Sequence, residues 1–302
     1  MKRLLWLFCF FYNSFSLAQD VIIPRFSFSF GEEGGKPGQF IAPTALSADA
    51  QGNLYIADQG NNRLQKFTNK GELVAFIGGF GWGQGQFHYP ADVFVYNSLD
   101  VFVADYENNR IERYDKDLNW LSSYRSDISW DERYQFFFPR SLFISIHGDF
   151  MIADAEHDKI VKLNSSFQPE LSFGDFDWGS GTIREAFSIF CDSHDFIYVS
   201  DSAAGKVLVY DYFGNYIRDI GLNQLKKPKG LFIDSAQRLF VADAGLDQIF
   251  CFDASGDLYF NFGSSGAKLG AFSEPSDVAV FNHQLFVVDT NNHRIQAFDL
   301  NW

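Results

Sequence analysis

The most regularly spaced chemical groups in this sequence are six aspartates, each of which ends an apolar run. They are Asp58, Asp105, Asp154, Asp201, Asp243 and Asp289, separated by 47, 49, 47, 42 and 46 residues. Each is followed by a polar turn and a second apolar run, as in "VFVADYENNRIERYD" (residues 101–115). A short carboxylate at a turn accepts hydrogen bonds from exposed backbone N–H groups. We therefore predict a structural ring of turn aspartates; an acidic metal site is the alternative.

A basic residue follows the aspartate by five positions in five of the six copies. The residues at this position are Arg63, Arg110, Lys159, Lys206, Gln248 and Arg294. We expect the cations among them to pair with aspartates on the same rim. The position before it holds Asn, Asp or Gly in most copies. These residue types tolerate the left-handed dihedral angles of a tight turn.

The elements that must position these residues are strands, because a period in the forties with strand-like content is typical of a β-propeller or another repeat array. Each repeat predicts four strands, and the first begins at a proline in five of the six copies. Proline at the start of a strand removes no donor that the sheet needs. First strands are expected at 43–48, 90–95, 139–144, 186–191, 228–233 and 275–280. Fourth strands are expected at 73–78, 171–174, 216–221 and 258–263.

The last repeat stops after three strands, at Asp299. Such an ending leaves an unpaired sheet edge, which invites aggregation. The segment "RFSFSFG" (25–31) alternates Phe with Ser and ends in Phe-Gly, as a fourth strand would. We predict that residues 25–30 complete the last blade. The predicted fold class is all-β: a six-bladed β-propeller of four-stranded antiparallel blades, closed by an N-terminal strand.

Glycine-rich loops precede several of the strand-opening prolines, as in "GGFGWGQGQFHYP" (78–90). Together with the apolar-Ala-Asp and Asn-x-Arg-Ile elements that follow, this pattern resembles the NHL-repeat family over residues 25–299. The resemblance implies a six-bladed β-propeller, in agreement with the repeat count. The chain departs from the family pattern in the loop 125–138, which lacks glycine, in the fourth repeat, which lacks the proline, and in the short loop "LNQLKKP".

Residues 1–18 have the pattern of a secretory signal peptide: Lys2 and Arg3, an apolar run, and "SLA" before Gln19. We expect a signal peptide at 1–18, a single propeller domain at 19–302, and a secreted protein, extracellular or periplasmic. A membrane anchor is the alternative, but the apolar run is shorter than the ~20 residues that a span needs. Cys191 and Cys251 fall in expected strands and are predicted to be apolar core residues.

Family resemblance implies ligand binding on the face that carries the loops between blades and the second-to-third-strand turns, here called the loop face. That face is expected to carry Phe80, Trp82, Phe87, His88, Tyr89, Trp130, Tyr134, Phe176 and Trp178. Aromatic rings form platforms for peptides or sugars. We expect Trp82, His88, Trp130 and Trp178 to contribute to a ligand site; packing over the tops of the blades is the alternative.

The residue after each strand-opening position is expected at the rim of the central channel. These residues are Thr44, Ala91, Arg140, Phe187, Lys229 and Ser276. Arg140 and Lys229 are cations on a protein of formal charge −14, or −16 once the signal peptide is removed. We expect these two cations to hold an anionic group. The alternative is that they pair with their neighbours Asp92 and Asp277.

Two enzyme classes compete with a binding role. Some NHL-like propellers are zinc lyases that act on α-hydroxyglycine peptide ends, with their zinc histidines just after the strand-opening prolines. Those slots hold no histidine here, and the six histidines of the chain fall in loops and turns where no three share a slot. Other six-bladed propellers are calcium-dependent lactonases, for which Asp92 and Asp277 are candidate ligands. The sequence has no G-x-S-x-G, Walker, H-E-x-x-H or C-x-x-C motif.

The sequence therefore predicts a non-catalytic binding scaffold for a peptide, protein or glycan at the loop face or channel mouth. A metal-dependent propeller enzyme, amidating-lyase-like or lactonase-like, is the alternative. We expect no cofactor, except zinc or calcium in the channel under that alternative. The acidic charge opposes binding to nucleic acid. We also expect a monomer without a stable membrane anchor.

Overall fold

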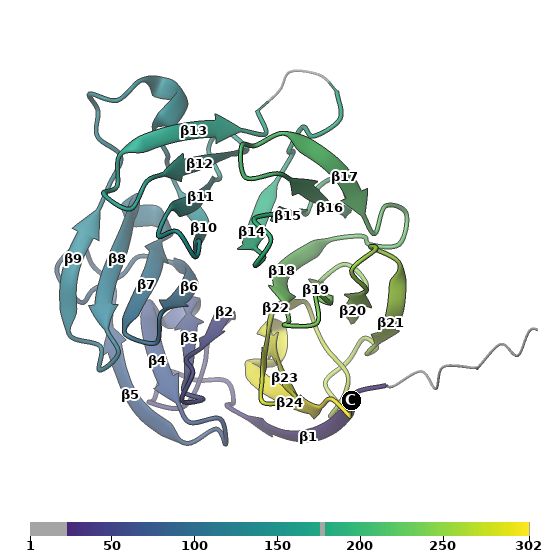
Figure 1. Ribbon diagram of the computed structural model, residues 1–302. Helices are drawn as coiled ribbons and strands as arrows, with labels where there is room; N and C mark the ends of the chain where they lie inside the picture. The colour runs from purple at the N-terminus through teal and green to yellow at the C-terminus, as the bar shows by residue number, and fades with distance from the viewer. Residues whose placement is uncertain (1–22, 176–178, 302) are drawn as a thin grey trace, which may run out of the picture.

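The computed structural model describes residues 23–175 and 179–301. The expected signal peptide at 1–18 and the expected loop-face residues Phe176 and Trp178 lie outside the described residues. The chain forms six four-stranded antiparallel sheets, which stand as blades around a central axis (Figure 1). The predicted six-bladed β-propeller is confirmed. Within the described residues, there is no helix long and apolar enough to cross a membrane.

Each blade runs from an inner strand at the axis to an outer strand at the rim (Figure 1). The inner strands of blades 1 to 6 are β2 (Pro43–Ala48), β6 (Pro90–Tyr96), β10 (Pro139–Ile144), β14 (Ala186–Cys191), β18 (Pro228–Ile233) and β22 (Pro275–Phe281). The second strands are β3 (Leu54–Asp58), β7 (Asp100–Asp105), β11 (Phe150–Asp154), β15 (Ile197–Asp201), β19 (Leu239–Asp243) and β23 (Gln284–Asp289). All twelve begin within a few residues of the positions that the repeat pattern predicts.

The third strands are β4 (Arg63–Phe67), β8 (Arg110–Asp115), β12 (Lys159–Leu163), β16 (Lys206–Tyr210), β20 (Gln248–Phe252) and β24 (Arg294–Asp299). The outer strands are β5 (Leu73–Gly78), β9 (Trp120–Tyr124), β13 (Pro169–Phe173), β17 (Tyr216–Ile220), β21 (Leu258–Phe262) and β1 (Arg25–Phe30). The 3-10 helices are η1 (Gln59–Asn61), η2 (Tyr106–Asn108), η3 (Glu132–Tyr134) and η4 (Thr290–Asn292). Three of these helices form the turns between second and third strands, and η3 lies in the loop without glycine.

The N-terminal strand β1 closes the ring by pairing antiparallel with β24, the last strand of the chain (Figure 1). Phe30 lies opposite Ile295 and Phe28 opposite Ala297 in this ladder. The ring of Phe30 packs against that of Phe67 in blade 1, with 5.0 Å between centroids. The strand therefore satisfies the edge of blade 6 and also joins that blade to blade 1.

The core consists of six apolar clusters, each shared by two neighbouring blades. Both faces of each blade are therefore covered, which explains why second strands such as "LFVAD" are apolar without alternation up to the final aspartate. Cys191 and Cys251 lie in two of these clusters and form no disulfide, as predicted. Packing between blades holds the six inner strands in place, and these strands carry the groups that line the channel.

Candidate functional site at the loop face

The pairing of inner and second strands skips the residue that follows each strand-opening position. In blade 1, Pro43 pairs with Asp58 and Ala45 pairs with Ala57, so Thr44 has no partner in the ladder. The same irregularity occurs in the other five blades. The skipped residues line one cavity of about 210 Å³, the loop-end cavity: Thr44, Ala91, Arg140, Phe187, Lys229 and Ser276. The structure thus brings together all six positions that the repeats predicted.

Arg140 is held in this cavity by aromatic rings. Its guanidinium carbon lies 4.8 Å from the ring centroid of Tyr106 and 5.4 Å from that of Phe187. Its Nη2 lies 3.4 Å from the hydroxyl oxygen of Tyr106, a long hydrogen bond. Its Nε is buried and has no hydrogen-bond partner among the described residues. The guanidinium is therefore oriented by stacking, and part of its donor capacity is unused.

Lys229 lies on the other side of Phe187, with its Nζ 5.3 Å from the ring centroid. Its ion pair with Glu274 is long, at 3.8 Å. Burial lowers the pKa of Lys229, and the positive charges of Lys227 and Arg140 lower it further, while the carboxylates of Glu274 and Glu185 raise it. Two incompletely neutralised cations thus flank one aromatic ring at the channel mouth.

The alternative that these two cations pair with Asp92 and Asp277 is wrong. Asp92 accepts hydrogen bonds from backbone N–H groups, among them that of Leu142 in the next blade at 2.9 Å. Asp277 likewise accepts from the N–H of Leu46 at 2.8 Å. Both carboxylates line a second cavity, on the far side of the strand-opening residues.

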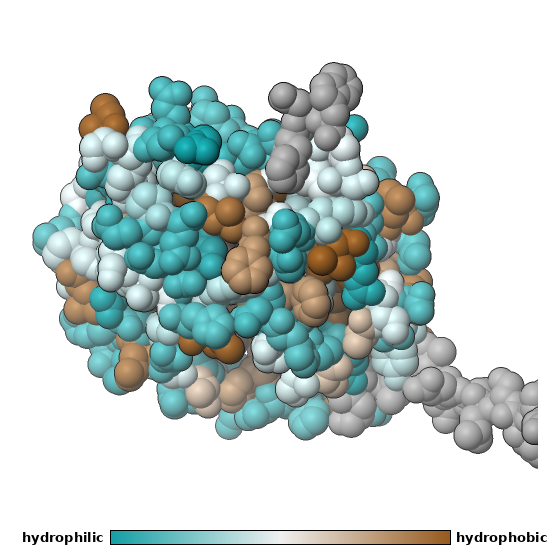
Figure 2. Space-filling model, turned by 45° about the horizontal axis from the view of Figure 1, so that its top comes forward, coloured by the Kyte–Doolittle hydropathy of each residue, from teal (hydrophilic) through white to brown (hydrophobic). Residues whose placement is uncertain are grey.

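Four rings of the loop between blades 1 and 2 form the loop-face aromatic cluster: Phe80, Trp82, His88 and Tyr89. Phe80 lies 5.3 Å from Trp82 and 5.0 Å from His88 between centroids, and His88 lies 5.3 Å from Tyr89. Phe80, Trp82 and Tyr89 are 56%, 66% and 48% exposed. The face drawn in Figure 2 is mostly hydrophilic, with separate groups of apolar residues. The cluster offers a continuous aromatic surface to solvent.

Other aromatic residues expected on this face serve the core. Phe87 is fully buried between blades 1 and 2. Trp130 is half-buried and packs against Phe167, with 6.1 Å between ring centroids. Tyr134 lies under the guanidinium of Arg133 at 5.4 Å. Phe87 and Trp130 therefore pack against other side chains of the propeller, which is the alternative that the sequence left open.

The turn aspartates tie the loop entering a blade to the turn between its second and third strands. Asp105 Oδ1 accepts the N–H of His88 at 2.8 Å, while Oδ2 accepts from Asn108 and from Nε of Arg110, both at 2.7 Å. Burial raises the pKa of Asp105, and these three hydrogen bonds lower it. The carboxylate therefore anchors His88 and, with it, the loop-face aromatic cluster.

The turn aspartate forms a close ion pair with the basic residue five positions later in blades 1, 2 and 6, but not in blades 3, 4 and 5. Blades 1, 2 and 6 contain Asp58–Arg63, Asp105–Arg110 and Asp289–Arg294 pairs at 2.6, 2.7 and 2.8 Å. In blade 3, Lys159 lies 3.9 Å from Asp154. In blade 4 the predicted partner is wrong, because Lys206 pairs with Asp219 of β17 at 3.1 Å. Asp201 and Asp243 accept backbone N–H groups from the entering loop and from their own turn.

The histidines do not gather at the channel. His147 pairs with Asp195 at 3.0 Å on the face opposite the loops, and His157 contacts Asp154 at 2.8 Å in a turn. Over residues 23–175 and 179–301, no group of three or more His, Cys, Asp or Glu side chains is placed to hold a metal ion. The chemistry that the described loop-end cavity offers is recognition of an anion beside aromatic rings.

Two segments of the chain, residues 40–67 and 272–298, match the family model described as NHL repeat. The human E3 ubiquitin-protein ligase TRIM32 is 26% identical over 203 residues, which cover 64% of this chain and 27% of that protein. Mouse NHL repeat-containing protein 3 is 28% identical over 200 residues, covering 64% and 51%. A probable peptidyl-alpha-hydroxyglycine alpha-amidating lyase of Caenorhabditis elegans is 28% identical over 144 residues, covering 46% and 40%. The chain thus spans about half or less of the length of these relatives.

Solved structures of low identity share the architecture. A streptogramin B lyase superposes with a TM-score of 0.63 at 12% identity, over 94% of this chain and 90% of that chain. A gluconolactonase from Xanthomonas campestris superposes with a TM-score of 0.65 at 13% identity, over 92% and 94%. At such identities the likeness shows the fold alone.

Proposed function

We propose that this chain, which carries NHL repeats on a six-bladed β-propeller, acts as a non-catalytic scaffold that binds a peptide or protein on its loop face. The partner presents a carboxylate, from an acidic side chain or a C-terminus, to the loop-end cavity. The loop-face aromatic cluster contacts the neighbouring residues of the partner. A glycan is the other ligand class that exposed aromatic rings accept.

The observation that carries this proposal is the state of Arg140, whose buried Nε has no hydrogen-bond partner among the described residues. A buried donor without a partner costs about 1–3 kcal/mol, more when it is charged. A carboxylate can accept two parallel hydrogen bonds from one guanidinium. A partner's carboxylate would therefore remove a cost that the free protein bears.

Lys229 adds a second reason for an acidic ligand. Its pKa is lowered by burial and by neighbouring positive charge, and Glu274 opposes this only from 3.8 Å. An anion bound between Lys229 and Arg140 offsets both effects. Phe187 separates the two cations and supplies an apolar contact for the carbon atoms next to the ligand's carboxylate.

The loop-face aromatic cluster is suited to the rest of the partner. Trp and Tyr are enriched among residues whose truncation costs most in protein interfaces. Trp82 and Tyr89 are exposed. The backbone N–H groups of Tyr89 and His88 donate hydrogen bonds to side-chain oxygens of Asn62 and Asp105, and these bonds fix the loop that carries the cluster. Little conformational entropy is then lost when a partner binds.

A peptide array tests the proposal. Peptides with acidic or neutral side chains, and with free or amidated C-termini, are screened against the purified protein, and binders are measured by fluorescence anisotropy. We expect binders to share an acidic group, and Arg140→Gln to weaken them about tenfold to a hundredfold, as the loss of a charged hydrogen bond implies. Lys70→Gln, which removes the same charge from an exposed turn on the opposite face, should leave affinity unchanged.

Three results would overturn the proposal. They are an array without preference for acidic groups, binding that Arg140→Gln leaves intact, and binding to a glycan array with no peptide bound. A stoichiometric metal in the purified protein, found by elemental analysis together with turnover of a peptide or lactone, would instead support the metal-dependent enzyme.

We also propose that the protein is exported, because residues 1–18 have the pattern of a signal peptide. N-terminal sequencing of the protein recovered from its native host should begin at Gln19. A first residue of Met1 on the recovered protein would contradict export through this segment.

A further inference from the structure

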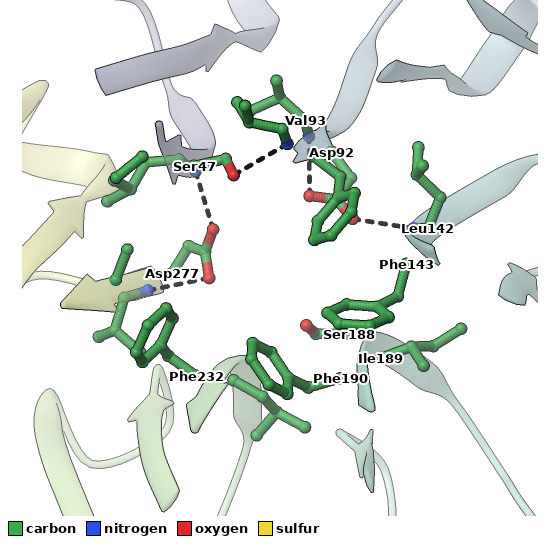
Figure 3. A pocket seen from close by; sticks show the side chains of 17 residues that line it. Ser47, Asp92, Val93, Leu142, Phe143, Ser188, Ile189, Phe190, Phe232 and Asp277 are labelled. Atoms are coloured by element: carbon green, nitrogen blue, oxygen red, sulfur yellow. Dashed lines mark hydrogen bonds between the residues drawn. The ribbon is translucent and has the colours of Figure 1, made fainter. Parts of the chain in front are cut away.

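The channel ends in a different cavity on the side opposite the loop face. This far-end cavity has a volume of about 240 Å³ and is lined by the inner strands of all six blades. Figure 3 shows two carboxylates, those of Asp92 and Asp277, and the rings of Phe143, Phe190 and Phe232 around one opening. The charged members of its described lining are the two aspartates.

An arc of phenylalanines from four consecutive blades forms the apolar part of the wall. Each occupies the fifth position of its inner strand: Phe94, Phe143, Phe190 and Phe232. Neighbouring ring centroids lie 4.6, 4.8 and 5.5 Å apart along the arc. The same position holds Ser47 in blade 1 and Ala279 in blade 6. The arc is therefore open at blades 6 and 1. Asp277 comes from blade 6, within this gap, and Asp92 comes from blade 2, at the end of the arc next to it.

Backbone N–H groups hold both carboxylates in place. Asp92 accepts from Val93 and Leu142 at 2.8 and 2.9 Å. Asp277 accepts from Val278 and Leu46 at 2.9 and 2.8 Å. Each oxygen thus takes one backbone donor, and the Ser141 side chain is a further hydrogen-bond partner of Asp92. A carboxylate oxygen has room for two donors. Each aspartate is therefore tied by a hydrogen bond to the blade that follows its own. The described lining of the cavity places no cation beside either carboxylate.

The environment of these carboxylates disfavours their charge. Burial raises the pKa of Asp92 to about 6, against three hydrogen bonds that lower it. Burial also raises the pKa of Asp277, and the negative charge of Asp92 raises it further. Two like charges in an apolar cavity are therefore costly without a counter-ion.

We propose that the far-end cavity binds a small organic ammonium ion, with its charged nitrogen at Asp92 and Asp277 and its apolar body against the phenylalanine arc. Ammonium N–H groups can use the free lone pairs of the carboxylates. The π-faces of phenylalanine rings attract a cation and also bury the apolar part of the ligand. The cavity is small by the standard of drug-sized sites, which suits a ligand with one ring or a short chain.

A bare divalent cation fits this cavity less well. Calcium takes 6–8 oxygen ligands, whereas the far-end lining consists of two carboxylates, two serines and otherwise apolar side chains. Ser47 already accepts the N–H of Val95 through its hydroxyl, at 3.1 Å. The proposal is independent of loop-face binding, because the two cavities share no lining residue.

Isothermal titration with a matched pair of probes tests the proposal without any mutation. Phenethylammonium and 2-phenylethanol have nearly the same shape and differ in charge. We expect the ammonium probe to bind at pH 7.5 at least about tenfold more tightly than the alcohol, the ratio set by one charged hydrogen bond. Its affinity should fall as the pH drops through about 6, where Asp92 gains a proton; Asp277 is the other titratable group that faces the cavity.

Two variants assign the binding to this cavity. Phe143→Leu removes the ring that contacts both Phe94 and Phe190 but keeps an apolar side chain. We expect this variant to weaken the ammonium about threefold to tenfold, the range of one cation–π contact, and to change alcohol binding less. Asp277→Asn should abolish the preference for the charged probe. Asp195→Asn is the control for ammonium affinity. It removes a charge from a turn on the same side of the propeller but outside the cavity, so this affinity should not change.

Equal affinity for the ammonium and the alcohol would overturn the proposal even if Asp277→Asn fails to fold. Ammonium binding that Phe143→Leu leaves unchanged would also overturn it. So would saturable binding of calcium chloride that displaces the ammonium at stoichiometric concentration, because the cavity would then be an inorganic cation site.

Discussion

The two ends of the channel are built from the same six inner strands, yet they carry opposite charges. The loop-end cavity holds Arg140 and Lys229, which stack on aromatic rings and lack full partners. The far-end cavity holds Asp92 and Asp277, which accept backbone N–H groups and face phenylalanines. In both cavities the protein leaves like charges close together. The comparison suggests that each cavity is completed by a ligand of the opposite sign.

The difference between the two cavities arises within a few positions of one strand. The residue after the strand-opening position faces the loop end, and the residues that follow face the far end. The strand irregularity at this point separates the two sets, because it turns the skipped residue out of the normal alternation. The repeats thus hold the backbone constant while the side chains of two separate sites vary independently.

The change with the largest expected effect is one that disrupts both cavities at once. Deletion of residues 23–30 takes away β1, so that the outer edge of blade 6 is unpaired and the joint with blade 1 is lost. The loss of the partly buried rings of Phe28 and Phe30 lowers the free energy of unfolding by at most about 3–6 kcal/mol, the value for two fully buried rings, and the loss of the strand ladder adds to this decrease. We expect aggregation or a non-cooperative melt by circular dichroism. Phe26→Ala, which changes an exposed ring of the same strand, should cost less than about 1 kcal/mol.

A substitution with a smaller effect on stability should impair binding at one end of the channel and not at the other. Asp105→Ala removes one of the two carboxylates beside the buried guanidinium of Arg110, which keeps Glu112 at 2.7 Å, and it releases the N–H of His88. Removing one partner of a buried pair costs at most about 3–5 kcal/mol, measured by denaturant unfolding. The folded fraction should lose loop-face binding and keep ammonium binding. Asp117→Ala, which breaks an exposed pair with Lys116, should change stability by no more than about 0.5 kcal/mol.

Charge removal at one end should leave the other end unaffected. Arg140→Gln is expected to weaken an acidic partner by about tenfold or more and to leave the affinity for phenethylammonium unchanged. Differential scanning fluorimetry should find a melting temperature at least as high as that of the wild type, because a buried unpaired donor is removed. A parallel loss of ammonium affinity would mean that the two cavities are coupled.

The smallest expected effect is a pH dependence. The pKa of Asp92 in the folded state is raised to about 6, so the folded protein holds that proton more tightly than the unfolded chain does. The stability that this proton contributes is present below the unfolded pKa and is lost as the pH rises through about 6. The melting temperature of the wild type, measured relative to that of Asp92→Asn, should therefore fall from pH 4 to pH 7. Addition of phenethylammonium at pH 7 should recover part of this loss.

Much of the fold could be predicted because it depends on local patterns repeated six times. Prolines at 43, 90, 139, 228 and 275 open inner strands as predicted. The alternation of Phe and Ser in β1 indicated the closing strand. A fourth strand was expected in every repeat, but that of blade 2, β9, was not located; its sequence, "WLSSY", lacks the glycine that ends or follows the other outer strands. Outer strands have one exposed edge, so packing constrains their sequence less.

The loop-end cavity could be predicted only in outline. The slot after each proline was identified, but the partners of Lys206 and the packing of Trp130 depend on contacts between segments distant in sequence. The far-end cavity was missed, although Phe94, Phe143, Phe190 and Phe232 occupy one repeat position that the sequence displays. Their direction could not be read, because the strand irregularity changes which residues face the channel.

Crystal structures with two small ligands test most directly the claim that the channel has ends of opposite preference. One crystal is soaked with phenethylammonium and another with phenylacetate. We predict the ammonium nitrogen within hydrogen-bond distance of Asp92 and Asp277, and the carboxylate of phenylacetate between Arg140 and Lys229. Both ligands at the same end, or each at the end predicted for the other, would contradict the account.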